Sequence, residues 1–292
     1  MNSKVQDLLK QLEERMAKIN RDELMSLLIA RTKHHHNYSF SNMIIAGMQL
    51  GRQQGRDFCL DVFANLWLAP FPVWNKWGYR IQRGAKALDI LTPIKYKREK
   101  KTNETTTNSE HEAEGFNVFF VTRPVFDVSQ TEKPVKNDNK LHRQVALGTT
   151  SLSFTDLLSK IHNAGLKVEF LPLKEDTGGH ISGNTITVNA NNTTEAQYGT
   201  LLHELGHYCL GHTSANRIQS RSVEELEAEA VAFILGDQFG IEIPSEFYIA
   251  AWNKDGHAIT KSLGNIDRAF KAALKLLGMG GTEEANVMTV AA

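Results

Sequence analysis

The stretch His203-Glu-Leu-Gly-His207, within Tyr198-Gly-Thr-Leu-Leu-His-Glu-Leu-Gly-His-Tyr-Cys-Leu210, decides how the C-terminal half of this chain folds. Its apolar residues recur at helical spacing, which predicts an amphipathic helix. Two histidines four residues apart project from the same face of such a helix, about one turn from each other. Both imidazoles can therefore reach one divalent ion, so the stretch predicts a metal-binding helix.

Glu204 lies beside the coordination position that such a site leaves open. In motifs of this kind the glutamate acts as general base on a metal-bound water. The expected reaction is peptide hydrolysis, in which Glu204 takes a proton from the water and then protonates the leaving amine. The motif predicts a zinc site, with another divalent ion such as Mn²⁺ as the alternative.

A catalytic zinc site usually needs a third protein ligand, and a second helix is expected to supply it. The run Val223–Leu235 has helical periodicity, with Ser222 as N-cap and Glu225 completing a capping box. Glutamates in a first turn commonly complement the helix dipole, which is the interpretation given to Glu225 and its neighbour Glu224. Glu227 is the preferred third ligand, and Glu229 is the alternative.

His212 is a competing third ligand, but its spacing does not fit. The pattern that uses a third histidine places glycine at position 210 and histidine at 213, where this chain has Leu210 and Thr213. His212 is instead expected just beyond a helix end at Gly211, facing the terminal carbonyls. Upstream, His180–Val188 reads as a hairpin turning at Gly183-Asn184, and it either presents an edge strand to a substrate peptide or is purely structural.

The overall composition fits a globular protein but hides a charge asymmetry. Residues 1–143 hold 23 Lys+Arg against 16 Asp+Glu, whereas residues 144–292 hold 10 against 17. Such a split predicts a basic module joined to an acidic one, with an anionic polymer as partner of the basic half. The two cysteines, Cys59 and Cys209, cannot build a disulfide framework. With no signal-peptide core and no run long enough to span a bilayer, a cytoplasmic protein without membrane contact is expected.

The basic half contains a segment, residues 67–101, in which aromatic and basic residues alternate. Aromatic rings can stack on unpaired bases while basic side chains follow the phosphates, so this segment predicts binding of single-stranded DNA. Burial of the tryptophans in the core is the alternative. The candidate DNA-binding residues are Trp74, Lys76, Trp77, Tyr79, Arg80, Arg83 and Lys86.

These features predict an α+β fold with two domains. Residues 1–130 would form the DNA-binding domain, opening with an amphipathic helix over 2–33 and containing strands at 87–96 and 116–128 around a polar loop. Residues 131–148, rich in lysine and asparagine, would be a linker. Residues 149–278 would form the metallopeptidase-like domain, followed by a tail at 279–292.

Both halves resemble one family. Tyr38-Ser-Phe-Ser-Asn42, Trp77-Gly-Tyr79 with Gly84, and Val125–Glu132 are similar to the N-terminal single-stranded-DNA-binding domain of ArdC antirestriction proteins. His203–His207 with Glu227-Ala-Glu-Ala230 is similar to ImmA/IrrE-like metallopeptidases, whose third ligand maps onto Glu227. The resemblance implies a plasmid-borne protein that protects incoming DNA during conjugation and acts on an unknown protein or peptide substrate. Two alternatives stay open, a DNA-binding shield with a structural or vestigial metal site, and an IrrE-like protease that cleaves a repressor.

Overall fold

The computed structural model describes residues 3–32, 38–56, 62–63, 65–97, 116–132, 151–213, 220–243 and 255–279. Helices and strands are both present, so the predicted α+β class is confirmed. The polar loop 102–115, the linker from residue 133 onward and nearly all of the predicted tail lie outside the described residues. Among the helices that are described, none is long and apolar enough to cross a membrane.

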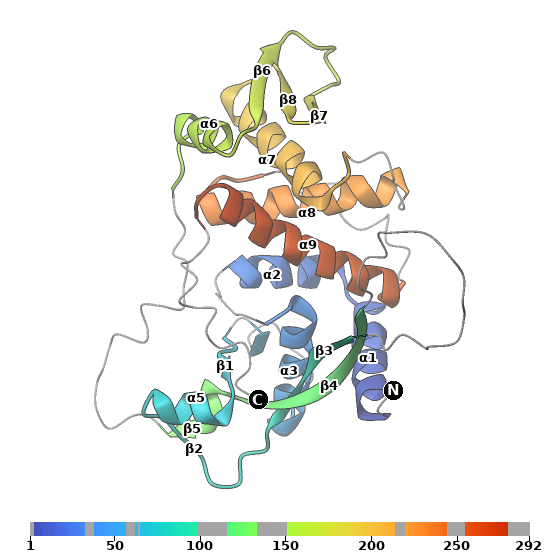
Figure 1. Ribbon diagram of the computed structural model, residues 1–292, viewed down its shortest axis with the longest axis vertical. Helices are drawn as coiled ribbons and strands as arrows, with labels where there is room; N and C mark the ends of the chain where they lie inside the picture. The colour runs from blue at the N-terminus through green and yellow to red at the C-terminus, as the bar shows by residue number, and fades with distance from the viewer. Residues whose placement is uncertain are drawn as a thin grey trace, which may run out of the picture.

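A small sheet forms one end of the molecule (Figure 1). Its strand order is β6-β8-β7, with β6 parallel and β7 antiparallel to β8. The β7–β8 hairpin turns at Gly183, whose φ of 57° is in the left-handed region, so the predicted hairpin is confirmed. Helix α6 precedes the sheet. The elements are α6 (Phe154–Asn163), β6 (Lys167–Leu171), β7 (Gly179–Ser182) and β8 (Thr185–Asn189).

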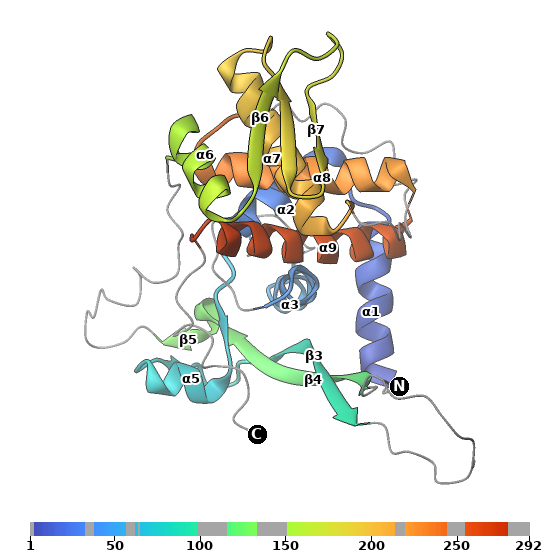
Figure 2. The same ribbon diagram turned by 45° about the horizontal axis from the view of Figure 1, so that its top comes forward.

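Three helices form the centre of the molecule. Helix α7 (Thr194–Leu210) runs from the small sheet toward α8 (Arg221–Phe239) and α9 (Gly256–Leu276), which lie side by side (Figures 1 and 2). The predicted end of α7 is confirmed, because Gly211 follows it with a φ of 76°. Helix α8 packs against both α7 and α9, and 12 of its 19 residues are buried.

The predicted helix over residues 2–33 is two helices, α1 (Ser3–Met16) and α2 (Arg21–Thr32). The break follows from a capping box at Asn20. The backbone N–H of Glu23 donates to Asn20 Oδ1, and the backbone N–H of Asn20 donates to Glu23 Oε2. This reciprocal pair begins a new helix inside a continuous apolar pattern, which explains why periodicity alone predicted a single one.

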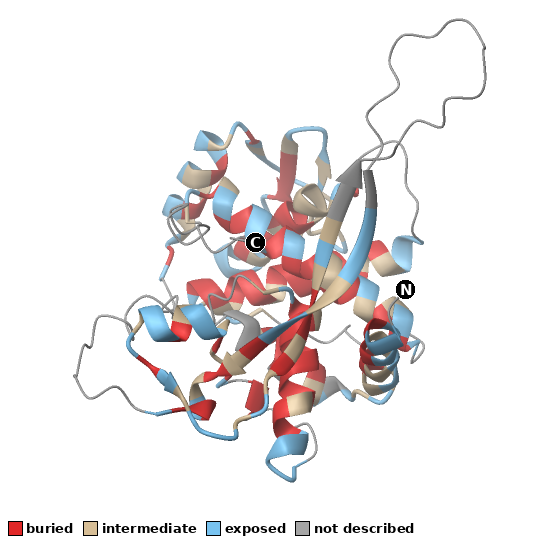
Figure 3. Cartoon of the chain, turned by 60° about the horizontal axis from the view of Figure 1, so that its bottom comes forward, coloured by how far each residue is buried: buried red, intermediate tan, exposed pale blue. Residues whose placement is uncertain are grey.

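The rest of the N-terminal half is built on a long antiparallel ribbon. Strands β3 (Leu88–Lys97) and β4 (Phe116–Asp127) pair over ten residues, close to the predicted bounds. Strand β1 (Leu68–Ala69) pairs with the C-terminal end of β4. In the N-terminal part of β4, Val118, Phe119 and Phe120 are 40–52% accessible. Figure 3 shows this long ribbon with an exposed outer stretch. Beside the C-terminal end of β4 lie α5 (Phe71–Lys76), β2 (Arg80–Ile81), η1 (Val128–Gln130) and β5 (Thr131–Glu132).

Helix α3 (Phe40–Gln53) is attached to the outer edge of β3 by two amide side chains. Asn42 accepts from the backbone N–H of Leu91 and donates to its carbonyl, both at 2.8 Å. Gln49, two turns later, does the same with the N–H and carbonyl of Asp89. Each amide thus replaces a neighbouring strand and satisfies backbone groups that would otherwise be unpaired.

One hydrophobic core joins the two halves of the chain. It runs without interruption from α1–α3 through β3 and β4 to α7–α9. Helix α9 meets α1 at Gly256, where a Cβ atom would overlap the backbone oxygen of Glu13. At the same contact, His257 Nδ1 lies 2.7 Å from Glu13 Oε1. The linker at residues 131–148 therefore stays a prediction. The two halves that it would join pack against each other through this core.

The contact at Gly256 predicts a stability effect that spans both halves. Gly256→Ala should lower the free energy of unfolding by about 1–3 kcal/mol, because the added methyl forces α1 away from α9. Gly264→Ala on the same helix is the control: its Cβ would meet only Arg268 Nη1, at 3.8 Å. That variant should be neutral or stabilising, because alanine is the better helix former. Urea unfolding of the full chain measures both, and equal stability of the two variants would contradict this contact.

Candidate metal centre

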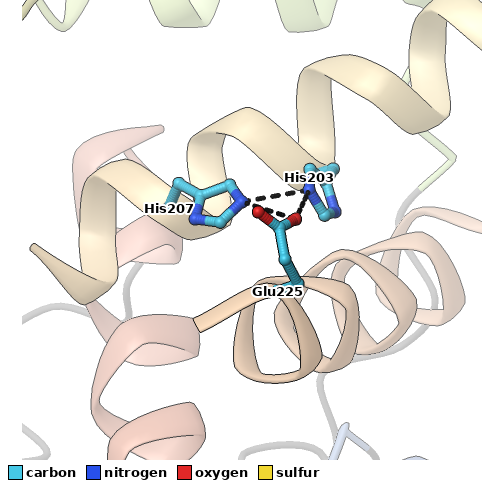
Figure 4. Close-up of side chains that lie close together, drawn as sticks. All are labelled: His203, His207 and Glu225. Atoms are coloured by element: carbon cyan, nitrogen blue, oxygen red, sulfur yellow. Dashed lines mark hydrogen bonds and ion pairs between the residues drawn. The ribbon is translucent and has the colours of Figure 1, made fainter. Parts of the chain in front are cut away.

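His203 and His207 point their Nε2 atoms toward each other from one face of α7 (Figure 4). The two nitrogens are 3.1 Å apart. From the neighbouring helix α8, Glu225 brings its Oε2 to 3.3 Å from His203 Nε2 and 3.4 Å from His207 Nε2. These three side chains form the one group of metal-ligand type found among the described residues.

The spacing of the three atoms fits a divalent metal ion. A tetrahedral ion bound at about 2.0–2.1 Å keeps its ligand atoms about 3.3–3.4 Å from one another. Each of the three separations in this cluster is within about 0.3 Å of that value. Two imidazole nitrogens and one carboxylate oxygen are also a ligand set used by zinc hydrolases, and three protein ligands leave a fourth position open. The cluster can therefore hold a divalent ion.

Close packing of α7 on α8 sets the distance between the histidines and the glutamate. Gly206 lies inside the histidine motif, and a Cβ atom there would be 2.9 Å from the backbone oxygen of Ala228. Such a contact is too short for any side chain larger than hydrogen. The glycine therefore allows the two helices to approach until Glu225 reaches both imidazoles.

The sequence prediction of Glu227 as third ligand does not agree with this geometry. Glu225 faces the histidines, whereas the Oε1 of Glu227 accepts a hydrogen bond of 2.8 Å from Asn265 of α9. Residues two apart on a helix point in nearly opposite directions, so both glutamates cannot face α7. Glu229, one turn after Glu225, shares its side of the helix, and its charge acts on His203.

Sequence reasoning missed Glu225 because it gave that residue to helix capping. In the structure α8 begins two residues earlier, at Arg221, its N-cap is Ser220, and this serine makes no capping hydrogen bond. The capping box predicted for Ser222 and Glu225 is therefore wrong. The available signal was the i, i+4 spacing of Glu225 and Glu229, which repeats the spacing of the two histidines.

Glu204 is buried beside the histidines, with 6% of its surface accessible. Burial raises the pKa of this carboxyl, and the nearby His203 and His207 oppose that rise. His180 of β7 also lowers it, which puts the edge strand within electrostatic reach of Glu204. A carboxyl with a raised pKa is suited to accept and return a proton near neutral pH.

The charges within the cluster support one another. Burial alone would lower the pKa of His203, but the hydrogen bond to Glu225 and the charge of Glu204 raise it instead. The imidazole of His203, and after it that of His207, holds the pKa of Glu225 far below its usual range. Glu225 is therefore an anion under ordinary conditions, which is the state required of a metal ligand.

Strand β7 is a free edge of the small sheet next to the cluster. In the described part of the chain it pairs only with β8. Gly178 and Gly179 bring it against α7: a Cβ at Gly178 would be 3.0 Å from Thr200 Oγ1, and at Gly179 it would be 2.7 Å from Thr200 Cγ2. Thr200 lies one turn before His203, so β7 begins against the turn of α7 that precedes the site.

The predicted DNA-binding residues separate into two groups. Trp74 and Tyr79 are buried with Ala69 in a second, aromatic core cluster, and the indole N–H of Trp74 donates to the carbonyl of Phe126. A fully buried indole cannot stack on a base, so these two predictions are corrected to core residues. Trp77 is half-buried at the rim of the same cluster. The predicted residues on the surface of α5, β2 and the turn after β2 are Lys76, Arg80, Arg83 and Lys86.

Comparison with known proteins finds a peptidase family model that matches the part of the chain containing the site. Residues 162–279 match the Peptidase_M78 family, described as an IrrE N-terminal-like domain, which confirms the resemblance of this part of the chain. The uncharacterized protein pXO2-81 of Bacillus anthracis is 24% identical over 241 residues, covering 70% of this chain and 41% of that protein. The chain thus spans less than half the length of this relative.

Two solved structures similar to the chain are of the antirestriction protein ArdC from plasmid R388, the family that the sequence motifs resemble. The Mn(II)-bound structure is 17% identical with a TM-score of 0.48, covering 89% of this chain and 98% of that one. The metal-free structure is 16% identical with a TM-score of 0.46, covering 73% and 78%.

Metal titration tests the ligand set directly. Glu225→Gln should weaken Zn²⁺ and Mn²⁺ binding by at least about 10-fold, because it removes the only anionic ligand atom of the cluster. Glu195→Gln, an exposed site on the first turn of α7, is the matched control and should bind like the wild type. Isothermal titration of the chelator-treated full chain measures both. Unchanged affinity in Glu225→Gln would exclude this carboxylate as a ligand.

Proposed function

We propose that this chain is an ArdC-type antirestriction protein that carries a metal-dependent peptidase site and a surface for single-stranded DNA. The observation that carries the peptidase part is the arrangement of His203, His207 and Glu225 around one point, with Glu204 buried beside them. The match of residues 162–279 to a peptidase family supports the same conclusion.

In the proposed site, the Nε2 atoms of the two histidines and the Oε2 of Glu225 hold a divalent ion, zinc or manganese. When bound, the ion supplies Lewis acidity that activates water and polarises a peptide carbonyl. Glu204 accepts the proton of the attacking water on its carboxylate and later returns it to the leaving amine. Its buried position raises its pKa, which favours this exchange of a proton near neutral pH.

The free edge of β7 is the proposed binding site for the substrate backbone. An extended peptide can pair with an unpaired strand through main-chain hydrogen bonds, which gives affinity without strong sequence preference. Because β7 is packed on α7 one turn before His203, a peptide paired there would run past the cluster. The substrate is therefore expected to be an unfolded or extended segment of a protein.

Glu204→Gln separates chemistry from metal binding. The variant should retain its bound ion but lose about 10²–10⁴-fold in hydrolysis, because glutamine cannot accept the proton. Cleavage of casein and of a quenched peptide library by the full chain loaded with Zn²⁺ or Mn²⁺ is the readout, and Glu195→Gln is again the control. Proteolysis at the wild-type rate in Glu204→Gln would remove this residue from the mechanism.

The same variant shows whether protection of DNA requires proteolysis or only a structural metal site. If the metal site is structural, Glu204→Gln should protect incoming plasmid DNA from restriction as well as the wild type does during conjugation. If proteolysis is required, protection should fall with hydrolysis. Plasmid transfer into a restricting recipient, compared with a non-restricting one, measures this difference.

For the DNA-binding part, the exposed basic residues of α5, β2 and the following turn support the proposal. Phe71, on the same helix as Lys76, is 51% accessible, and its ring makes an edge contact with Phe126. An exposed aromatic beside basic side chains is suited to stack on a base while phosphates are neutralised nearby. The family motifs in residues 38–42, 77–84 and 125–132 support the same function through resemblance.

A salt series tests this surface in the full chain. The triple substitution Lys76→Gln, Arg83→Gln and Lys86→Gln should weaken binding to a labelled single-stranded oligonucleotide. It should also reduce the slope of log affinity against log salt by about 2, since each lost phosphate contact contributes about 0.7. Arg80 is left unchanged because it faces Glu132 across the β2–β5 pair.

Lys167→Gln with Lys174→Gln, on the exposed surface near the small sheet, is the matched control. It should leave both the affinity and the slope unchanged. Equal behaviour of the triple variant and this control would contradict the placement of DNA on α5 and β2.

A further inference from the structure

A further histidine, His212, contacts His207 on the side of its ring opposite the proposed metal. While the Nε2 of His207 faces His203 and Glu225, its Nδ1 lies 3.0 Å from the Nδ1 of His212. His212 follows the end of α7 and is buried, with its backbone N–H donating to the carbonyl of His207. Its side chain therefore contacts the imidazole of His207, and not the helix-end carbonyls that sequence analysis predicted for it.

The contact continues from His212 to a buried carboxylate. The Nε2 of His212 lies 3.5 Å from the Oε2 of Glu227, a residue that is 1% accessible. That oxygen is buried and has no hydrogen-bond partner, whereas Oε1 is held by Asn265. Asn265 in turn accepts from Arg268 on α9. The carboxylate of Glu227 is thus fixed by α9 and turned toward His212.

With both rings neutral and a hydrogen of His212 directed at the unpaired oxygen of Glu227, the contacts behind His207 allow one arrangement of protons along this row. An ionised carboxylate only accepts, so His212 must carry its hydrogen on Nε2. The Nδ1 of His212 is then an acceptor, which requires His207 to carry its hydrogen on Nδ1. The Nε2 of His207 is left with a free lone pair, and this is the atom that faces the proposed metal.

We propose that His212 and Glu227 are positioning residues that fix the tautomer and the ring orientation of His207 for metal binding. This inference rests on the proposed function, because it takes His207 to be a ligand. Metal-binding histidines commonly depend on such partners, and losing one typically costs about 10–100-fold in metal affinity. In this proposal Glu227 does not bind the metal but orients the ligand His207 through His212.

The isosteric substitution Glu227→Gln provides the sharpest test. An amide can donate to the Nε2 of His212, which would move the hydrogen of His212 to Nδ1 and that of His207 to Nε2. The metal-facing lone pair would then be lost although the shape is unchanged. Glu227→Gln should therefore weaken Zn²⁺ binding by about 10–100-fold.

Substitution of His212 gives a matched pair. His212→Leu removes the acceptor for His207 and should weaken Zn²⁺ binding to a similar extent as Glu227→Gln. His212→Asn places an oxygen near the position of the lost Nδ1 and should keep most of the affinity. The double variant Glu227→Gln with His212→Leu should be no worse than His212→Leu alone, because the two residues act as one unit.

Histidine tautomers in the metal-free full chain provide a readout that needs no catalysis. Long-range ¹H–¹⁵N correlation spectra near pH 8 are recorded in a Glu225→Ala background, because the carboxylate of Glu225 otherwise attracts a hydrogen to the Nε2 of His207. His207 should be protonated on Nδ1 in Glu225→Ala and on Nε2 when Glu227→Gln is added. A His207 protonated on Nε2 in Glu225→Ala would overturn the proposal, and so would unchanged Zn²⁺ affinity in both Glu227→Gln and His212→Leu.

The two proposals fail in different ways. If Glu225→Gln and His203→Ala leave Zn²⁺ affinity unchanged, the metal centre is wrong, and the tautomer spectra still report on the contact between His207 and His212. If those variants lose the metal while Glu227→Gln and His212→Leu keep it, the metal centre stands and the positioning role is wrong.

Discussion

The close contact between α7 and α8 at Gly206 is the constraint on which the site depends. A glycine there lets the backbone of one helix approach Ala228 of the other. At that separation the side chain of Glu225 reaches both imidazoles from α8. A larger residue at position 206 would move the carboxylate away from the histidines, so the glycine within the motif is a requirement of packing as much as of local helix geometry.

Local patterns in the sequence were sufficient for most of the elements and for half of the site. The histidine spacing, the stop at Gly211 and the β7–β8 turn each depend on neighbours a few residues away, and all of them are found in the structure. The third ligand depends on how α8 is rotated about its own axis. Because α8 is buried on several sides and its buried residues include Glu224 and Glu227, its pattern has no single apolar face from which to read that rotation. Only contact with α7 and α9 separates Glu225 from Glu227.

The same reasoning explains the outcome for the aromatic residues. Tryptophan serves equally well in a core and on a base, so the composition of residues 67–101 could not decide between these roles. In the structure Trp74 fills the second cluster and satisfies its N–H internally, while basic residues on the same elements stay exposed. Residues of the family motifs in this half also have structural roles. Asn42 bonds to the edge of β3, and Asp127 forms a capping box with Gln130. Resemblance in these motifs therefore reflects the fold of this half.

Helix α9 connects the N-terminal half to the metal centre without an intervening loop. Its first turn packs on α1 at Gly256 and Glu13, and two to three turns later Asn265 holds the carboxylate of Glu227. A displacement of α1 at that contact would be passed along a rigid helix to the residues behind His207, because a packed core does not absorb such shifts continuously. A fragment that ends before residue 144 would leave the apolar faces of α1 and α2 without their partners. Binding and catalysis therefore have to be measured on the full chain, where each half supplies part of the core of the other.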